Sequence, residues 1–459
     1  MRVLLLNPPG SRIYIRDYFC SKTTKSNYLF HPIDLVMLSG IVASRHEVLV
    51  LDAIAERLDV PSAQARIDGF APEAIVSLVG SVSWPEDRAF LAEQAARGRR
   101  VIAIGDVLHE KAGLRLVEEP WIEAALGNFI GADVLKILER RYGELLDSVV
   151  RLPDGRVEIH TSRGKLHGTY SIPRPRHELF PSAGYRFSFA RSEPFATILT
   201  DWGCPFPCEF CVMSTLGFAT RPVPEVMEEI DELRSRGIRE LFVMDQTFGV
   251  RRKRGLELCA AMAERGDLSW TTYARPDQAD DELLGAMRRA GCHTVMMGVE
   301  SADPRVLEGY EKRYELGDVR EGFARAKRHG LRTVGTFIIG LPEETEASIR
   351  ASLDLALELD LDFMSLNMAV PRFGTPFRAR AIELVLIDAN DLVMDQGGAE
   401  AKLPTQALDR ATMLALKRRM VRRFYLRPSY LWRRATSAKS LFELRSQARE
   451  GLALLFRNV

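Results

Sequence analysis

Short apolar runs alternate with amphipathic stretches over the first 140 residues of the chain. The runs at 3–6, 48–51, 74–79 and 101–104 predict buried strands. Helical patterns near 33–44 and 86–97 separate some of these runs. Buried strands spaced by helices predict a parallel sheet that is covered on both faces. We therefore expect a doubly wound, Rossmann-like α/β domain over residues 1–146.

The pattern changes after residue 146. Residues 147–194 contain the turn signal Leu152-Pro-Asp-Gly155 and the later prolines Pro173, Pro175 and Pro181, which predicts a connector. Residues 195–376 then show six successive strand–helix units. These units predict a partial (β/α)6 barrel of the TIM type, with functional residues at the carboxyl ends of its strands. The expected strands lie near 195–200, 240–244, 270–274, 294–299, 333–339 and 363–369.

The last part of the chain, residues 377–459, is expected to be helical and basic. From residue 403 onward it holds 13 Lys or Arg against three acidic residues, and aromatic residues interleave with the charge. We expect these helices to pack on the barrel with a solvated cationic face. The alternative is a peripheral contact with an anionic membrane surface. The basic residues match no known nucleic-acid-binding module, so nucleic acid is not an expected partner.

The composition is that of an ordinary soluble protein. The 459 residues are 46% hydrophobic and 27% charged, and the net charge of +1 predicts no general affinity for polyanions. The apolar run at the N-terminus is too short for a signal peptide. No stretch approaches the roughly 18 apolar residues of a membrane span. We therefore expect a cytoplasmic protein, whose thiols stay reduced.

Three of the six cysteines crowd into one loop directly after the first expected barrel strand. Cys204, Cys208 and Cys211 follow the spacing C-x3-C-x2-C. Three thiolates can hold three irons of a [4Fe–4S] cube and leave the fourth iron open. A structural zinc site would need a fourth ligand, and no other Cys or His lies near this loop in the sequence. Six cysteines are too sparse in a chain of this length for a disulfide framework, so we interpret the loop as a cluster site.

This loop, with the aromatic Phe210 just before its third cysteine, resembles the hallmark of the radical S-adenosylmethionine (SAM) superfamily. The resemblance implies that the open iron chelates the amino and carboxylate groups of SAM. It also implies that one electron splits the sulfonium into methionine and a 5′-deoxyadenosyl radical, and that the protein positions the cofactors and shields the radical. The implied partners are a small-molecule substrate and an electron donor such as flavodoxin or ferredoxin.

Residues at the ends of the later expected strands extend this resemblance. Asp245 matches an acidic variant of the family's ligand for the SAM ammonium group, with a helix cap as the alternative. Glu300 and Ser301 resemble the family's contacts to the SAM ribose and carboxylate, with a capped strand end as the alternative. Ile338 is expected to pack against adenine. Arg275 is expected to pair with the SAM carboxylate, with Glu300, or within a plain ion pair at the barrel rim.

The first domain resembles the cobalamin-binding domain that precedes many radical SAM cores. The matching segments are Asn7-Pro-Pro9, His31–Leu35, His46–Val48 and Ser81-Val-Ser83. The family's Gly-Gly pattern at the end of the fourth strand reads Gly105-Asp106 here. The Asp-x-His-x-x-Gly pattern, which supplies an axial histidine in other cobalamin proteins, is absent. Cobalamin binding and a degenerate scaffold that binds no corrin therefore both stay open.

Together these resemblances predict a radical SAM enzyme that functionalises an unactivated C–H position. The first hypothesis is cobalamin-dependent C-methylation of a lipophilic or natural-product substrate, such as a lipid or tetrapyrrole. The second is cobalamin-independent cyclisation, rearrangement or C–C coupling, and the third is a cluster-carrying binding or sensor protein. Cys259 and Cys292 are expected to be buried free thiols. Cys20 either is buried as well or faces the substrate.

Overall fold

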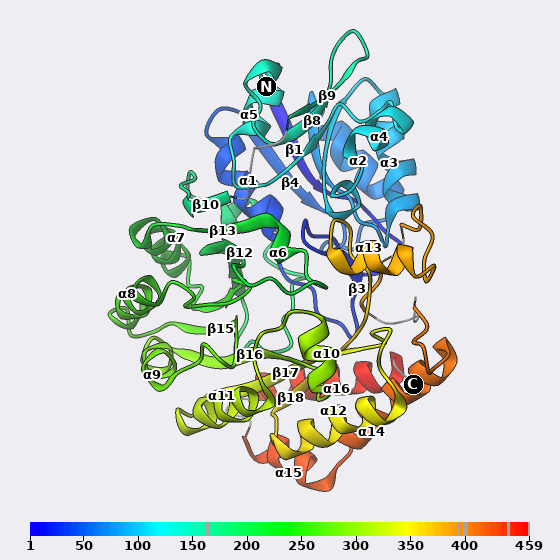
Figure 1. The fold of residues 1–459 in the computed structure, drawn as a ribbon. Helices are drawn as coiled ribbons and strands as arrows, with labels where there is room; N and C mark the ends of the chain where they lie inside the picture. Colours follow the sequence, from blue (N-terminus) through cyan, green and yellow to red (C-terminus); the bar gives the residue numbers. More distant parts are fainter. Residues whose placement is uncertain (161–165, 393, 398–402, 438–440, 458–459) are drawn as a thin grey trace. The chain divides into compact units, whose positions relative to one another are not determined.

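The computed structural model describes residues 1–160, 166–392, 394–397, 403–437 and 441–457 (Figure 1). These residues form two compact units. The first consists of Met1–Thr24, Leu29–Tyr185 and Leu392–Met394, and the second of Lys25–Tyr28, Arg186–Asp391 and Asp395–Val459. Each unit is built around its own sheet. Residues 393, 398–402, 438–440 and 458–459, which belong to the expected C-terminal region, lie outside the described part.

The first unit contains a seven-stranded sheet in the order β4-β1-β5-β6-β7-β8-β9. The pairings from β4 to β7 are parallel, whereas β7–β8 and β8–β9 are antiparallel. All four strands expected from the apolar runs are present, so the α/β class is confirmed. Two strands of this sheet, β8 and β9, come from the segment expected as a connector. The strands are β1 (Arg2–Asn7), β4 (Glu47–Asp52), β5 (Ala74–Leu78), β6 (Arg100–Ile104), β7 (Ala124–Leu126), β8 (Ser148–Arg151) and β9 (Val157–His160).

Helices and short strands complete the first unit. Helix α1 (Ile33–Ala43) is buried along nearly its whole length, because it is apolar on all sides and lies inside the unit. Helix α2 (Val60–Phe70) begins where the Asp59 carboxylate accepts a hydrogen bond of 2.9 Å from Ser62 N. The other elements are α3 (Trp84–Ala96), α4 (Ala112–Glu118), α5 (Asp133–Leu138), β2 (Tyr14–Ile15), β3 (Lys22–Thr23), β10 (Leu166–Thr169) and the 3-10 turns Asp106–Leu108, Tyr142–Glu144 and His177–Leu179.

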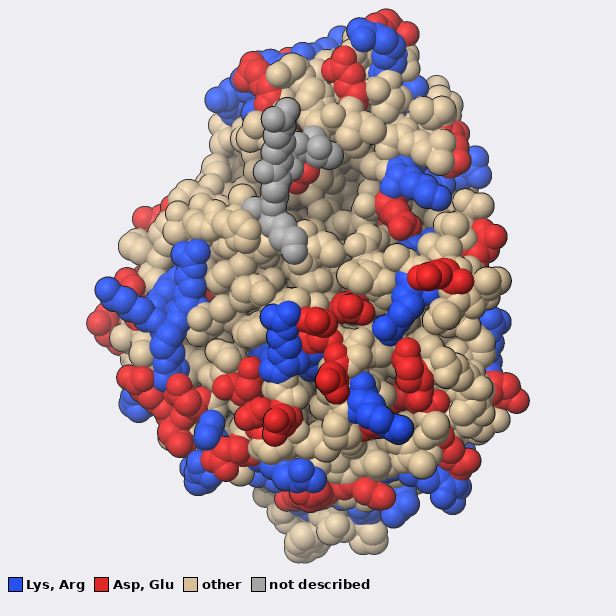
Figure 2. Space-filling model, in the orientation of Figure 1, with Lys and Arg blue, Asp and Glu red and all other residues tan. Residues whose placement is uncertain are grey.

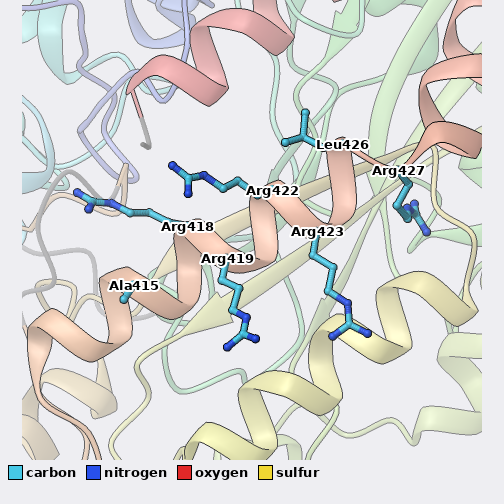
Figure 3. A pocket seen from close by; sticks show the side chains of 7 residues that line it. All are labelled: Ala415, Arg418, Arg419, Arg422, Arg423, Leu426 and Arg427. Atoms are coloured by element: carbon cyan, nitrogen blue, oxygen red, sulfur yellow. The ribbon is translucent and has the colours of Figure 1, made fainter.

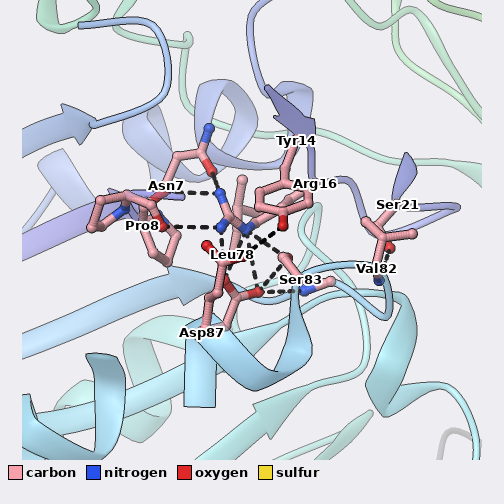
Figure 4. A network of polar contacts seen from close by, with 12 residues as sticks. Asn7, Pro8, Tyr14, Arg16, Ser21, Leu78, Val82, Ser83 and Asp87 are labelled. Atoms are coloured by element: carbon pink, nitrogen blue, oxygen red, sulfur yellow. Dashed lines mark hydrogen bonds and ion pairs between the residues drawn. The ribbon is translucent and has the colours of Figure 1, made fainter. Parts of the chain in front are cut away.

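The order of the parallel strands creates a switch point between β1 and β5, where ligands of doubly wound sheets usually bind. A buried polar network occupies the carboxyl ends of these strands (Figure 4). The Arg16 guanidinium donates to Asp87 Oδ1 at 2.7 Å, to Ser83 Oγ at 3.0 Å and to Asn7 Oδ1 at 2.9 Å. Arg16 and Asp87 are both excluded from solvent. Residues 7–16 are therefore held over the switch point by charge-assisted hydrogen bonds.

We expect Asp87→Asn to lower the free energy of unfolding by about 3–5 kcal/mol, because it leaves the buried Arg16 charge uncompensated. Chemical denaturation of the purified variant measures this change. The matched control is Asp154→Asn, whose partner Arg156 is exposed, and its cost should be below about 1 kcal/mol. Equal costs for the two variants would contradict the assigned role of the buried pair.

The second unit contains a six-stranded sheet in the order β11-β14-β15-β16-β17-β18, with every pairing parallel. The order of the strands in space follows their order along the chain, as in a partial βα-barrel, and β11 and β18 lie at its two ends. All six strands expected from the sequence are present. They are β11 (Phe195–Ile198), β14 (Glu240–Val243), β15 (Ser269–Ala274), β16 (Cys292–Glu300), β17 (Arg332–Ile339) and β18 (Phe363–Met368).

Amphipathic helices join these strands and cover the outer side of the sheet (Figure 1). Their apolar faces form one continuous core with the strands. Helix α9 (Asp281–Arg289) begins at the Asp280 cap, and α12 (Glu346–Glu358) begins with a capping box formed by Thr345 and Ser348. The other connecting helices are α7 (Val223–Ser235), α8 (Arg252–Ala263), α10 (Pro304–Gly309), α11 (Leu316–Arg328) and α13 (Pro376–Glu383).

Three helices follow in the basic C-terminal region: α14 (Arg410–Tyr425), α15 (Pro428–Ser437) and α16 (Leu441–Arg457). Met413, Met420 and Phe424 of α14 pack into the core of the second unit. On the face shown in Figure 2, acidic and basic side chains are interspersed, in keeping with the small net charge. Among the described residues, no helix has both the length and the apolar character that a bilayer span requires.

Candidate iron–sulfur and SAM site

The three cysteines of the motif lie on a loop that a short hairpin carries. Strands β12 (Asp201–Gly203) and β13 (Gly217–Thr220) pair antiparallel, and the loop and helix α6 (Met213–Leu216) lie between them. Gly203 has a positive φ of 69°, and a Cβ atom there would lie 2.0 Å from Gly217 O, so the hairpin needs a glycine at this position. The backbone of Glu209 donates to Tyr310 O at 3.1 Å and accepts from Phe377 N at 3.2 Å, which anchors the loop.

The thiols have the chemistry that an iron–sulfur cluster needs. All three are free, Cys208 is buried, and Cys204 and Cys211 are partly buried. Burial raises the pKa of Cys204, and it raises the pKa of Cys211 to about 12. Buried thiols become thiolates when they bind a cation, so metal binding should release protons here. Among the described residues, no three His, Cys, Asp or Glu side chains lie close enough together to bind a single metal ion. A [4Fe–4S] cube does not need this, because each thiolate binds a different iron. The donor set therefore fits a [4Fe–4S] cluster.

Arg275, which follows β15, lies directly against the cysteine loop. Its Nη1 is 3.9 Å from Cys208 Sγ, and its guanidinium lies 3.8 Å from the centre of the Phe206 ring. The same side chain bonds Asp277 at 2.9 Å and Lys312 O at 2.9 Å. The alternative in which Arg275 pairs with Glu300 is therefore not the observed one. A guanidinium beside a ligand sulfur stabilises the thiolate and affects the reduction potential of a cluster.

Glu300 ends strand β16 in a strained conformation. The pairing of β16 with β17 shifts register between Gly298 and Glu300, and Glu300 has a positive φ of 62°. Such a bulge redirects a side chain, and a non-glycine residue with positive φ needs support from its surroundings. The support comes from Lys312, whose Nζ lies 2.7 Å from Glu300 Oε1. Burial by itself would lower the pKa of Lys312. The negative charge of Glu300 and other nearby groups outweigh this effect, so the pKa of Lys312 lies above its usual value.

Ser301, the next residue, is connected to the loop after β17. Its hydroxyl lies 3.4 Å from Glu344 Oε1, while Glu344 Oε2 accepts bonds from Gly340 N at 2.8 Å and Leu341 N at 3.2 Å. Burial raises the pKa of Glu344 to about 7. The two loops that carry Ser301 and the end of β17 are thus joined through one carboxyl group. Ile338 of β17 is partly buried against the apolar cluster that contains Phe210 and Tyr310.

Asp245, which follows β14, is fully buried. Its carboxylate accepts hydrogen bonds from Thr200 N at 2.7 Å, Thr200 Oγ1 at 2.5 Å and Asp201 N at 2.9 Å. Burial raises the pKa of Asp245 and, together with the neighbouring Asp245 charge, raises that of Asp201. Arg254 of α8 lies 2.7 Å from Asp201 Oδ1. These contacts tie the ends of β11 and β14 together below the cysteine loop.

Sequence reasoning missed several residues of this site. Lys312 lies in an irregular segment after α10 and carries no motif, and only its contact with Glu300 indicates a role. Lys25 belongs to the four-residue stretch of the second unit that comes from the N-terminal part of the chain. Its Nζ donates to Leu366 O and Asn367 Oδ1, both at 2.7 Å, at strand β18. No local pattern near Lys25 predicts this position.

The residues that resemble a cobalamin domain lie at the strand ends of the first unit. The Asp106 carboxylate accepts four hydrogen bonds of 2.7–2.9 Å from the backbone and hydroxyl groups of Ser21 and Ser81. Cys20 is buried, and His109 is partly buried. Residues 14–24 of the same unit cover the switch point, where Arg16 and Ser21 bind residues at the strand ends.

The fold and the site have counterparts among known proteins. The model of the radical SAM superfamily matches residues 202–356. An uncharacterized methyltransferase of Pyrococcus horikoshii, PH0819, is 30% identical over 420 residues, which cover 87% of this chain and 89% of that protein. The radical SAM methyltransferase TsrM of Kitasatospora setae, solved with cobalamin and a [4Fe-4S] cluster, has a TM-score of 0.65 at 20% identity over 83% of this chain and 75% of its own. The cobalamin-dependent SAM radical enzyme OxsB has a TM-score of 0.69 at 13% identity over 97% of this chain and 70% of its own.

The second unit is a partial βα-barrel with three cysteines on one loop at a strand end, and a doubly wound unit precedes it. These features define an iron–sulfur enzyme of the SAM-cleaving type. The chain belongs to the radical SAM superfamily. It is an enzyme that uses a [4Fe–4S] cluster and SAM. The two structural likenesses show the fold, which agrees with the class expected from the sequence.

Proposed function

We propose that this enzyme methylates an unactivated carbon of a lipophilic small molecule, with the radical formed from SAM taking the hydrogen atom. The single observation that carries this proposal is the similarity to PH0819, a protein named as a methyltransferase, over nearly the whole length of both chains. The cobalamin-dependent enzymes TsrM and OxsB, whose folds cover most of this chain, support the same reaction class. Methylcobalamin, when bound, would supply the methyl group.

In this proposal Cys204, Cys208 and Cys211 hold three irons and leave the fourth for SAM. Glu300, aimed by the bulge and by Lys312, accepts hydrogen bonds from the ribose hydroxyls. Ser301 donates to the SAM carboxylate. These residues come from neighbouring strand ends, so one bound SAM molecule can reach all of them.

Other side chains would orient SAM and keep the site dry. Ile338 and Phe210 offer an apolar surface to the adenine. Asp245 contributes negative charge near the ammonium group, while its present hydrogen bonds to Thr200 and Asp201 fix its position. Arg275 contacts Cys208 Sγ and packs on the Phe206 ring, which fixes the cysteine loop. Exclusion of water strengthens each of these interactions and protects a radical.

A second candidate is a cobalamin-independent cyclisation, rearrangement or C–C coupling. The specific observation in its favour is the hydrogen-bonded closure of the switch point by Arg16, Ser21 and their partners. A scaffold that is closed in this way could shape a substrate pocket without binding a corrin. The radical step on the second unit would be the same.

The experiment that tests these functions uses the full chain, purified without oxygen and with a reconstituted cluster. With SAM and a reductant, we expect 5′-deoxyadenosine by chromatography, and its absence would contradict both candidates. Titration with hydroxocobalamin, followed by its visible spectrum, then separates them. One equivalent bound at micromolar concentrations is expected for the methyltransferase. No binding at millimolar concentrations would leave the cobalamin-independent reaction.

The reaction also requires a one-electron donor, and we propose a flavodoxin or a ferredoxin in the cytoplasm. The free buried thiols of Cys208, Cys259 and Cys292 support a reducing compartment. Reduction by a purified flavodoxin, followed as 5′-deoxyadenosine formed per minute, would support this donor.

A further inference from the structure

Helix α14 carries a stripe of arginines on its exposed side, which we call the arginine face: Arg418, Arg419, Arg422 and Arg423. Together with Ala415, Leu426 and Arg427 they line a surface hollow (Figure 3). Figure 3 shows Arg419 and Arg423 extending to one side of the helix axis and Arg418 and Arg422 to the other. The opposite side of α14 is buried in the core of the second unit. The arginine face is therefore not needed for packing.

The described part of the protein neutralises little of this charge. Among the described residues, no carboxylate lies within ion-pair distance of Arg418, Arg419 or Arg422, and the carboxylate paired with Arg423, that of Asp354, is 3.8 Å away. Like charges four residues apart, as in the pairs 418/422 and 419/423, destabilise a helix. Some other exposed arginines of this unit pair closely with acids, as Arg320 does with Glu358 at 2.6 Å. Residues 410–437 contain nine Lys or Arg and no Asp or Glu.

Large apolar side chains are also exposed at the end of α14 and in the helix that follows it. Leu426, which lines the same hollow, is 49% exposed. In the following helix, Leu431 is 52% exposed and Trp432 is 73% exposed. Among the described residues, no other tryptophan or phenylalanine is as exposed as Trp432. Tryptophan beside cationic residues is the composition of segments that lie at a membrane–water interface.

We propose that the arginine face, with Leu426, Leu431 and Trp432, docks the protein on the surface of a bilayer that contains anionic lipids. The guanidinium groups bind lipid phosphates through paired hydrogen bonds, and the apolar side chains insert among the headgroups. A nucleic acid would be attracted by the arginines but would gain little from exposed leucine side chains. The proposal stands independently of the reaction catalysed, since it concerns a surface on the outer side of the second unit.

The test is co-sedimentation of the full chain with vesicles of phosphatidylcholine alone and of phosphatidylcholine mixed with phosphatidylglycerol. We expect binding to the mixed vesicles only, and weaker binding as salt is raised. The variant Arg418→Gln/Arg419→Gln/Arg422→Gln/Arg423→Gln should lose at least about a hundredfold in affinity, because each basic residue near such a surface contributes roughly fivefold. Trp432→Ser should weaken binding several-fold.

The matched control is Arg288→Gln/Arg289→Gln, which removes two adjacent exposed arginines at the end of α9. It should bind as the wild type does, and circular dichroism should give the same helix content for all variants. A blue shift of tryptophan fluorescence on mixed vesicles, absent in Trp432→Ser, provides a second measurement. The proposal is wrong if the wild type binds neither vesicle, binds both equally, or binds as tightly without the four arginines. Loss of flavodoxin or nucleic-acid binding in the quadruple variant, with vesicle binding intact, would also overturn it.

Discussion

Replacing Cys208 with alanine is expected to remove the cluster and abolish SAM cleavage. Cys208 is the buried member of the three, and its sulfur lies 3.9 Å from Arg275 Nη1. With only two thiolates left, the loop cannot hold three irons of a cube. Iron content should fall from about four atoms per chain to near zero, and the formation of 5′-deoxyadenosine should fall below detection. Iron and sulfide analysis and anaerobic chromatography measure the two effects.

Cys259→Ala is the matched control for this prediction. Cys259 is also buried, but it lies in helix α8 within the apolar core, and burial raises the pKa of its thiol to about 12. We expect this variant to keep its iron and its activity. Iron and sulfide at the wild-type level in Cys208→Ala would show that another residue completes the site, and the assigned ligand set would then be wrong.

Lys312→Met is expected to weaken SAM binding more than tenfold and to destabilise the second unit. The variant leaves the Glu300 carboxylate buried without its 2.7 Å partner, and such a change typically costs about 3–5 kcal/mol. Glu300 has a positive φ and should leave its strained position when Lys312 no longer holds it. Chemical denaturation gives the stability of the reconstituted enzyme, and anaerobic calorimetry gives the SAM dissociation constant.

Two further variants separate positioning from general loss of stability. Lys327→Met removes a half-buried lysine from α11, whose carboxylate partner lies 3.5 Å away, and should cost below about 1 kcal/mol with no effect on SAM. Glu300→Gln/Lys312→Met should recover part of the stability, because neither charge is then left unpaired, but it should not recover SAM affinity. An unchanged SAM dissociation constant in folded Lys312→Met would refute the positioning role.

The sequence predicted the elements of the fold well where the pattern of apolar residues is local. The strands near 195–200, 240–244 and 333–339 were expected within a few residues of their observed bounds, because a buried parallel strand is a short apolar run between helices. Strands β8 and β9 were not expected. Both are short antiparallel strands; β8 is largely buried, and β9 is the partly exposed edge strand of the sheet. Short alternating segments around a Pro-Asp-Gly turn are equally typical of a connector.

In the candidate site, too, the sequence predicted local features but not contacts between distant residues. The cysteine spacing and the Glu300-Ser301 pair are contiguous in sequence, so both were identified without a structure. The contacts of Glu300 with Lys312, of Ser301 with Glu344 and of Lys25 with β18 join residues that lie 12, 43 and more than 300 positions apart. Asp245 was identified as a candidate, but its three hydrogen bonds to Thr200 and Asp201 depend on the pairing of β11 with β14.

The sequence by itself determined the two-unit α/β architecture and the three-thiol loop, because periodicity and short spacing are properties of neighbouring residues. Its resemblance to the radical SAM superfamily then indicated the chemistry. Only the tertiary structure decided which charges meet. It placed Lys312 against Glu300 and Arg275 against Cys208, and it closed the switch point with Arg16. Among the described residues, it left the arginine face of α14 without close acidic partners. These contacts arise from sheet order, a bulge and helix packing, and no single segment of the chain contains that information.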